Sequence, residues 1–267
     1  MDTNTIIIAF LLTLFAGLST GIGSAIAFFA KRTNKRFLSL SLGFSAGVMV
    51  YISFVELFPL SVSYFGETMT DKMAQGMTAI AFFGGMFLIA IIDKLIPSYE
   101  NPHEVKSIEM DDTSEYAGLK RMGIMSAIAI TIHNIPEGMA TFTTSLADMQ
   151  LAFPIAIAIA LHNIPEGIAV SMPIYFATGD RKKAFLLSFL SGLSELAGAI
   201  IAFILIYFVF GISNVVLGVM FAAVAGIMVF ISIDELLPAS KEYGAHHLSI
   251  YGMIAGMIIM AVSLVLL

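Results

Sequence analysis

Long apolar runs constrain the fold of this chain more than any other feature of its sequence. A helix needs about 20 apolar residues to cross the roughly 30 Å hydrocarbon core of a bilayer. With 58% apolar and only 12% charged residues, and a mean hydropathy of +0.94, the chain has too little polar surface to coat a water-soluble particle. We therefore predict one all-α integral membrane domain over residues 1–267. Its transmembrane helices are expected near residues 6–30, 37–60, 76–96, 122–145, 151–176, 184–210, 214–237 and 248–267.

The composition also excludes several classes of protein. Cysteine is absent, which excludes disulfides, thiolate metal sites and a Cys nucleophile. The net charge of −6 includes no broad basic face, so nucleic acid is not an expected partner. The first apolar run is too long for a signal-peptide core and lacks a basic start, so it is interpreted as a retained span. No nucleotide-binding loop is visible, which argues against ATP-driven pumping.

The distribution of basic residues indicates the orientation of the spans. Every Lys and Arg except Lys72 lies in or beside the connections that follow spans one, three, five and seven. Cytoplasmic loops are enriched in Lys and Arg, so these connections are expected in the cytoplasm. They include an acidic segment at about 97–120 that is too polar to pack within a membrane. The predicted location is the cell (inner) membrane, with both termini outside the cytoplasm.

Two distant segments of the chain repeat each other. Residues 49–61 in span two and 228–240 in span seven agree at eight of thirteen positions, at a constant offset of 179. The charge rule makes these spans run in opposite directions, which is typical of an inverted-topology repeat. Two unrelated apolar helices of similar composition are the alternative, but the shared Glu-Leu-x-Pro-x-Ser favours a repeat. The predicted architecture is 3+2+3, in which spans 1–3 and 6–8 are inverted repeats around a central pair.

The central pair of spans carries a second, plainer repeat. Residues 133–140 and 162–169 are identical at seven of eight positions and both begin His-Asn-Ile-Pro-Glu-Gly. The His and Glu are four residues apart and share one helix face. Each Pro removes an amide proton and is expected to disturb its helix, and each Gly allows a close helix approach. Both motifs lie near the middle of oppositely directed spans, so their polar faces can meet near the bilayer midplane.

This constellation predicts a divalent-metal site. A carboxylate at mid-membrane is costly unless it is compensated, and no basic residue lies in the central part of either span. A lone His within a helix is more often a packing residue, but duplication of the whole set favours a metal. Mixed imidazole and carboxylate ligands suit Zn²⁺, Fe²⁺, Mn²⁺ or Co²⁺. The candidate ligands are His133, Asn134, Glu137, His162, Asn163 and Glu166.

Other acidic residues are weaker candidates. Glu195 in span six is a further carboxylate at depth, for which hydrogen bonding to nearby serines is the alternative role. Glu56 and Glu235 are repeat mates near the ends of their spans, and Asp234 precedes Glu235. Solvation at the membrane surface explains these three residues about as well as a role in an ion pathway.

The paired motifs, the eight spans, the cytoplasmic loop after span three and Glu195 resemble the ZIP family of divalent-metal transporters over essentially the whole chain. The resemblance implies transport toward the cytoplasm of zinc, iron, manganese and related ions, which are substrates rather than prosthetic groups. It also implies a two-metal centre in which Glu137 and Glu166 bridge both ions. His133 and His162 would complete the first ion's ligands, and Asn134, Asn163 and Glu195 the second's. Many relatives have Pro after the span-six Glu, where this chain has Leu196.

The function that we expect is uptake of divalent transition-metal ions into the cytoplasm. A gated metal channel that uses the same ligands is the alternative. A membrane-embedded metalloenzyme is disfavoured because there is no HExxH pattern, and because neither His nor a carboxylate lies three residues after Glu137 or Glu166. The expected partners are divalent metal ions and the lipid bilayer, and a homodimer is compatible with the sequence.

Overall fold

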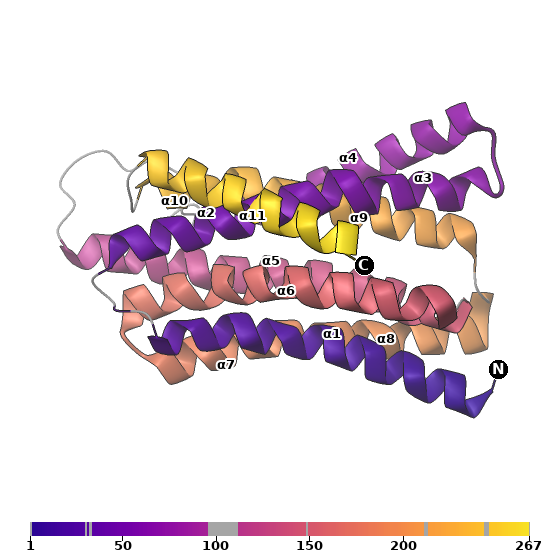
Figure 1. The fold of residues 1–267 in the computed structure, drawn as a ribbon, viewed down its shortest axis with the longest axis horizontal. Helices are drawn as coiled ribbons and strands as arrows, with labels where there is room; N and C mark the ends of the chain where they lie inside the picture. Colours follow the sequence, from indigo (N-terminus) through magenta and orange to yellow (C-terminus); the bar gives the residue numbers. More distant parts are fainter. Residues whose placement is uncertain are drawn as a thin grey trace.

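The computed structural model describes residues 2–29, 31, 34–95, 112–147, 149–210, 213–242 and 246–266. Nearly all of them are helical and none lies in a strand, which confirms the all-α prediction for this part of the chain. The helices run along the long axis of the molecule (Figure 1). In chain order they are α1 (Thr3–Phe29), α2 (Lys35–Ile52), η1 (Ser53–Leu57), α3 (Phe58–Gly66), α4 (Asp71–Leu95), α5 (Asp112–Ala147), α6 (Met149–Thr178), α7 (Arg181–Gly192), α8 (Ser194–Leu205), η2 (Ile206–Phe210), α9 (Asn214–Ile231), η3 (Ser232–Leu236), α10 (Leu237–Glu242) and α11 (His246–Leu266).

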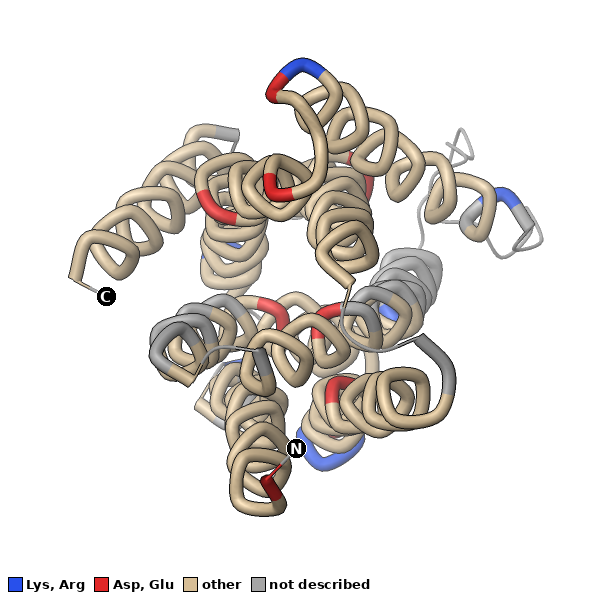
Figure 2. The backbone as a smooth tube through the Cα atoms, turned by 90° about the vertical axis from the view of Figure 1, so that its right-hand side faces the viewer, with Lys and Arg blue, Asp and Glu red and all other residues tan. Residues whose placement is uncertain are grey.

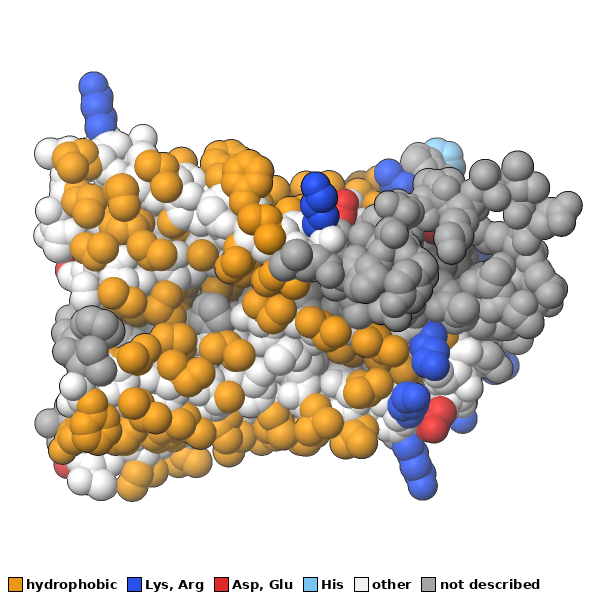
Figure 3. Space-filling view, turned by 180° about the vertical axis from the view of Figure 1, so that it is seen from behind, with side chains coloured by type: hydrophobic (Ala, Val, Ile, Leu, Met, Phe, Trp, Pro, Cys, Tyr) orange, Lys and Arg blue, Asp and Glu red, His pale blue; other side chains and the backbone are white. Residues whose placement is uncertain are grey.

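Within the described residues, six helical stretches are long and apolar enough to cross a membrane. Their exposed side chains form a broad hydrophobic surface, while Lys and Arg gather mainly toward one end of the molecule (Figure 3). This distribution is the one expected where lipid tails cover the middle of a helical protein. The six stretches cover residues 3–26, 35–66, 71–92, 181–208, 214–242 and 247–266.

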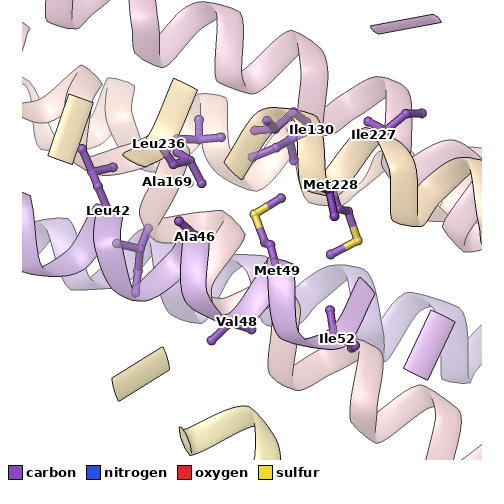
Figure 4. Close-up of a cluster of buried hydrophobic side chains, with 14 of the residues drawn as sticks. Leu42, Ala46, Val48, Met49, Ile52, Ile130, Ala169, Ile227, Met228 and Leu236 are labelled. Atoms are coloured by element: carbon purple, nitrogen blue, oxygen red, sulfur yellow. The ribbon is translucent and has the colours of Figure 1, made fainter. Parts of the chain in front are cut away.

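The helices are arranged in two groups around α5 and α6 (Figures 1 and 2). On one side α1 packs on α6 and α7, and α8 packs on α5. On the other side α2 packs on α11, and α4 packs on α9. The main core lies where α2 and α9 meet the central helices, and Met49 and Met228 approach each other there (Figure 4).

Local sequence explains where two of the helices begin. The Oδ1 atom of Asn34 accepts a hydrogen bond of 3.1 Å from the amide of Phe37 and caps α2. The Oδ1 atom of Asp180 accepts one of 3.0 Å from the amide of Lys183 and caps α7 in the same way. Between α6 and α7, Gly179 has a φ of 71°, a left-handed conformation that glycine adopts without strain.

Two π-helical segments, η1 and η3, interrupt the long helices that contain α2 and α9. Each lies just before a proline, Pro59 or Pro238, and the segments are offset by the same 179 residues as the sequence repeat. A wider turn accommodates the missing amide proton and the ring of the proline. Glu56, half-buried in η1, and Glu235, buried in η3, therefore occupy corresponding places in unusual backbone.

Three boundaries differ from the sequence-based expectations. Helix α5 begins at Asp112, so the end of the segment predicted as a loop at about 97–120 is helical, while residues 96–111 lie outside the described part. Helices α5 and α6 continue through Pro136 and Pro165, because one missing amide proton does not end a helix that neighbours hold on several sides. Span six instead breaks at Leu193, between α7 and α8, although Leu196 stands where a proline was implied.

Candidate metal centre

Three carboxylates lie in the interior of the helix bundle. Glu137 comes from α5, Glu166 from α6 and Glu195 from the first turn of α8, and none is more than 2% exposed. The negative charges of Glu137 and Glu166 both act on Glu195, so the three groups share one electrostatic environment. Acidic residues can be seen among the helices in the end-on view (Figure 2). The structure thus brings together the three carboxylates that the sequence predicts for the site.

The two asparagines of the repeated motif are fully buried beside these carboxylates. The Nδ2 atom of Asn134 donates a hydrogen bond of 3.1 Å to the carbonyl of Ser191. The Nδ2 atom of Asn163 donates one of 2.9 Å to the carbonyl of Ala16, and another to Oε1 of Glu195. These bonds use the amide protons and leave the carbonyl oxygens to other partners.

Several buried oxygen atoms lack a hydrogen-bond partner within the described part of the chain. They are Oδ1 of Asn134, Oδ1 of Asn163, Oε2 of Glu195 and Oγ1 of Thr20. A buried polar atom without a partner is costly and uncommon in a native protein. Carboxylate and amide oxygens accept hydrogen bonds or bind cations but cannot donate to one another. The group therefore fits a cation in its midst.

No basic side chain compensates these charges in the part of the structure with described side chains. Every Lys and Arg there is exposed: Lys31, Lys35, Arg36, Lys72, Lys94, Lys120, Arg181, Lys182, Lys183 and Lys241. Buried carboxylates in a membrane are expensive unless they are paired. The positive charge must come from a bound cation or from protons.

The side chains of His133 and His162 lie outside the described part of the structure. Their backbones belong to α5 and α6, one helical turn before Glu137 and Glu166. Among the side chains that are described, no three His, Cys, Asp or Glu residues form a complete metal-binding group. The two-metal centre and the two histidine ligands therefore stay predictions.

Glycine allows the helices of the site to approach closely. A Cβ atom at Gly138 would lie less than 3.0 Å from the carbonyl oxygen of Glu195, and one at Gly167 less than 3.0 Å from that of Thr20. The close approach expected at both motif glycines is confirmed. In addition, Oγ of Ser45 donates a hydrogen bond of 2.7 Å to the carbonyl of Pro165 and ties α2 to α6.

Thr20, Ser45 and Ser191 border the site and were not predicted from the sequence. Ser191 contributes only its carbonyl, and a backbone group has no residue-specific signal. Thr20 and Ser45 lie among small residues of apolar helices, a pattern that usually marks helix contacts. Their roles depend on which helix lies opposite, and this is visible only in the fold.

The helical membrane fold and its buried acidic centre define a membrane protein suited to holding cations. A family model described as "ZIP Zinc transporter" matches residues 97–264, more than half of the chain. The chain is 63% identical over 258 residues to the zinc transporter ZupT of Streptococcus mutans, covering 97% of each chain. It is 56% identical over 280 residues to the zinc transporter ZupT of Clostridium perfringens, covering 99% of this chain and 98% of that one.

The protein belongs to the ZIP zinc transporter family, as the sequence motifs indicated. It is therefore a multi-pass membrane transporter and not an enzyme.

Proposed function

We propose that this protein carries divalent transition-metal ions across the cell membrane into the cytoplasm, zinc foremost and with it iron, manganese or cobalt. One observation carries the proposal: Glu137, Glu166 and Glu195 are buried together, and every described Lys and Arg is exposed. The curated relatives are named zinc transporters, which supports zinc as the cargo. Mixed oxygen and nitrogen ligands without thiolate suit an ion that must also be released.

In the proposed site, Glu137 and Glu166 bridge two ions. His133 and His162 complete the first ion's ligands, and Asn134, Asn163 and Glu195 the second's. The unpartnered Oδ1 atoms of both asparagines and Oε2 of Glu195 support the second set. An ion that enters exchanges its hydration shell for these fixed oxygens, which replace the water ligands it loses.

We further propose eight spans in the 3+2+3 arrangement, with α5 and α6 as the central pair. Matching contacts at the 179-residue offset support it. Gly47 of α2 lies against the backbone of Met253 in α11, and Gly226 of α9 lies against that of Phe82 in α4. Likewise Oγ of Ser61 donates to the carbonyl of Gly218, and Oγ of Ser240 donates to the carbonyl of Ser39. Two halves related by a pseudo-two-fold axis produce such paired contacts.

Zinc uptake into proteoliposomes tests the proposed cargo. We expect saturable uptake of radioactive zinc that excess unlabelled Zn²⁺, Fe²⁺, Mn²⁺ or Co²⁺ reduces, since these ions share a preference for mixed imidazole and carboxylate ligands. An equal excess of Mg²⁺ should compete weakly, because it gives up its water shell reluctantly. Counterflow of preloaded zinc would indicate a carrier, and an ionic conductance would indicate the alternative gated channel. Uptake no greater than that of empty liposomes would refute the proposal.

The proposed orientation predicts which exposed positions an impermeant thiol reagent reaches. The chain has no native Cys, so single substitutions report one site each. Thr70 lies in the turn before α4, and Lys182 lies in the first turn of α7, at opposite ends of the molecule (Figure 1). In intact cells Thr70→Cys should be labelled and Lys182→Cys should not, whereas both should react after permeabilisation. The reverse pattern would overturn the orientation and the direction of import.

A further inference from the structure

The contacts on the two sides of the central helices correspond residue by residue. Asn134 of α5 donates to the carbonyl of Ser191, and Asn163 of α6 donates to that of Ala16. The asparagines are 29 residues apart, and their acceptors are 175 residues apart. The glycine contacts keep both offsets: Gly138 meets Glu195 and Gly167 meets Thr20, while Gly198 meets Ile135 and Gly23 meets Ile164. Helix α1 therefore relates to α6 as α7 and α8 relate to α5.

This correspondence pairs Thr20 with Glu195. Both residues are fully buried, and both belong to helices that cross at Gly17 and Gly192. The Cβ atom of Glu195 lies 3.4 Å from the Cβ position of Gly17, while the side chain of Thr20 packs on Gly192. The two side chains therefore occupy equivalent places on either side of one helix crossing.

The two sides differ in chemistry at this pair. Glu195 has a carboxylate whose Oε1 accepts a hydrogen bond from Asn163. Thr20 has a neutral hydroxyl, and its Oγ1 has no hydrogen-bond partner within the described part of the chain. On the Thr20 side, Oδ1 of Asn134 also lacks a partner there. Thr20 is therefore the place where a fourth carboxylate would stand if the site were symmetric.

We propose that Thr20 is a cargo-site residue that sets how tightly the metal is held. This inference rests on the proposed function, because it concerns the same ions. Glu137, Glu166 and Glu195 supply three negative charges against the four positive charges of two divalent ions. The neutral hydroxyl of Thr20 offers an oxygen ligand without adding a charge, which leaves the loaded site with a net positive charge and favours release. A carboxylate at this position would neutralise the loaded site and retain the metal.

The first test compares two substitutions of similar size in the full-length protein. Thr20→Asp adds a charge, whereas Thr20→Val removes the hydroxyl. By competition with a chelating dye in detergent, Thr20→Asp should lower the Kd for zinc by about tenfold or more. Its maximal rate of zinc uptake in proteoliposomes should fall, because release becomes slower. Thr20→Val should raise the Kd a few-fold. Equal zinc affinity in wild type, Thr20→Asp and Thr20→Val would overturn the proposal.

A transposition of the carboxylate gives the sharper result. Glu195→Thr alone should weaken zinc binding, and adding Thr20→Glu should bring the Kd back to within about tenfold of wild type. Failure of the double variant to bind better than Glu195→Thr, with both proteins monodisperse, would refute the equivalence of the two positions. Zinc binding by wild type and its loss in Glu137→Ala test the proposed function separately, so a failure confined to Thr20 leaves that function standing.

Discussion

Replacing Glu137 or Glu166 by alanine is expected to abolish zinc uptake while the protein remains in the membrane. Each substitution removes a buried negative charge that the proposed site places next to both ions. At an effective dielectric constant of about 20, one unit charge 4 Å from another contributes about 4 kcal/mol. Loss of that attraction corresponds to at least a hundredfold weaker binding, to order of magnitude. The measurement is the initial rate of zinc uptake per unit of membrane protein.

The companion variants separate a specific loss from a general one. Glu242→Ala removes the same charge from an exposed position at the end of α10 and should transport like wild type. His133→Ala should be milder than Glu137→Ala because water can replace one neutral ligand. Glu195→Ala should fall between them because it affects chiefly the second ion. Near-normal uptake by both Glu137→Ala and Glu166→Ala would contradict a shared bridging site.

A single methyl group at Gly138 is expected to disrupt both the fold around the site and transport. The added Cβ would lie less than 3.0 Å from the carbonyl oxygen of Glu195, so α8 must move away from α5. Overpacking of this kind typically costs about 1–3 kcal/mol. Because the shift displaces Glu195 itself, zinc uptake per folded molecule should fall together with thermal stability in detergent.

Two other glycines serve as matched controls for Gly138→Ala. Gly84 in α4 has nothing within 4 Å of its Cβ position, so Gly84→Ala should change neither stability nor uptake. Its neighbour Gly85 lies against the backbone of Ala223 in α9, far along the chain from the motif. Gly85→Ala should lower stability without altering zinc affinity. If Gly138→Ala proves as stable and active as Gly84→Ala, the close approach of α5 and α8 is wrong.

The helices could be predicted from the sequence because a membrane imposes a simple length rule. The predicted runs near 6–30 and 76–96, for example, correspond to α1 and α4 within a few residues. The rule reads only apolar stretches, and it therefore missed the polar start of α5 at Asp112. Hydropathy says nothing about a helix that continues beyond the lipid.

The burial of Glu137 and Glu166 could also be predicted, because each helix carries the complete motif and its periodicity fixes one face. The break at Leu193 and the π-helical segments could not. They depend on contacts between distant segments, such as the hydrogen bond from Ser61 to Gly218. The role of Thr20 was hidden for the same reason, since its correspondence with Glu195 appears only once α1 is placed against α6. A threonine in an apolar helix has no distinctive pattern of its own.

Anomalous scattering at the zinc absorption edge, from crystals of the zinc-loaded protein, tests the central claim most directly. The account predicts zinc peaks between α5, α6 and α8, with carboxylate oxygens of Glu137 and Glu166 about 2.0–2.2 Å from the metal. Crystals of Glu137→Ala, grown under the same conditions, should lose these peaks. Zinc bound only at the ends of the helices, with none beside Glu137 and Glu166 in the wild-type crystals, would contradict it.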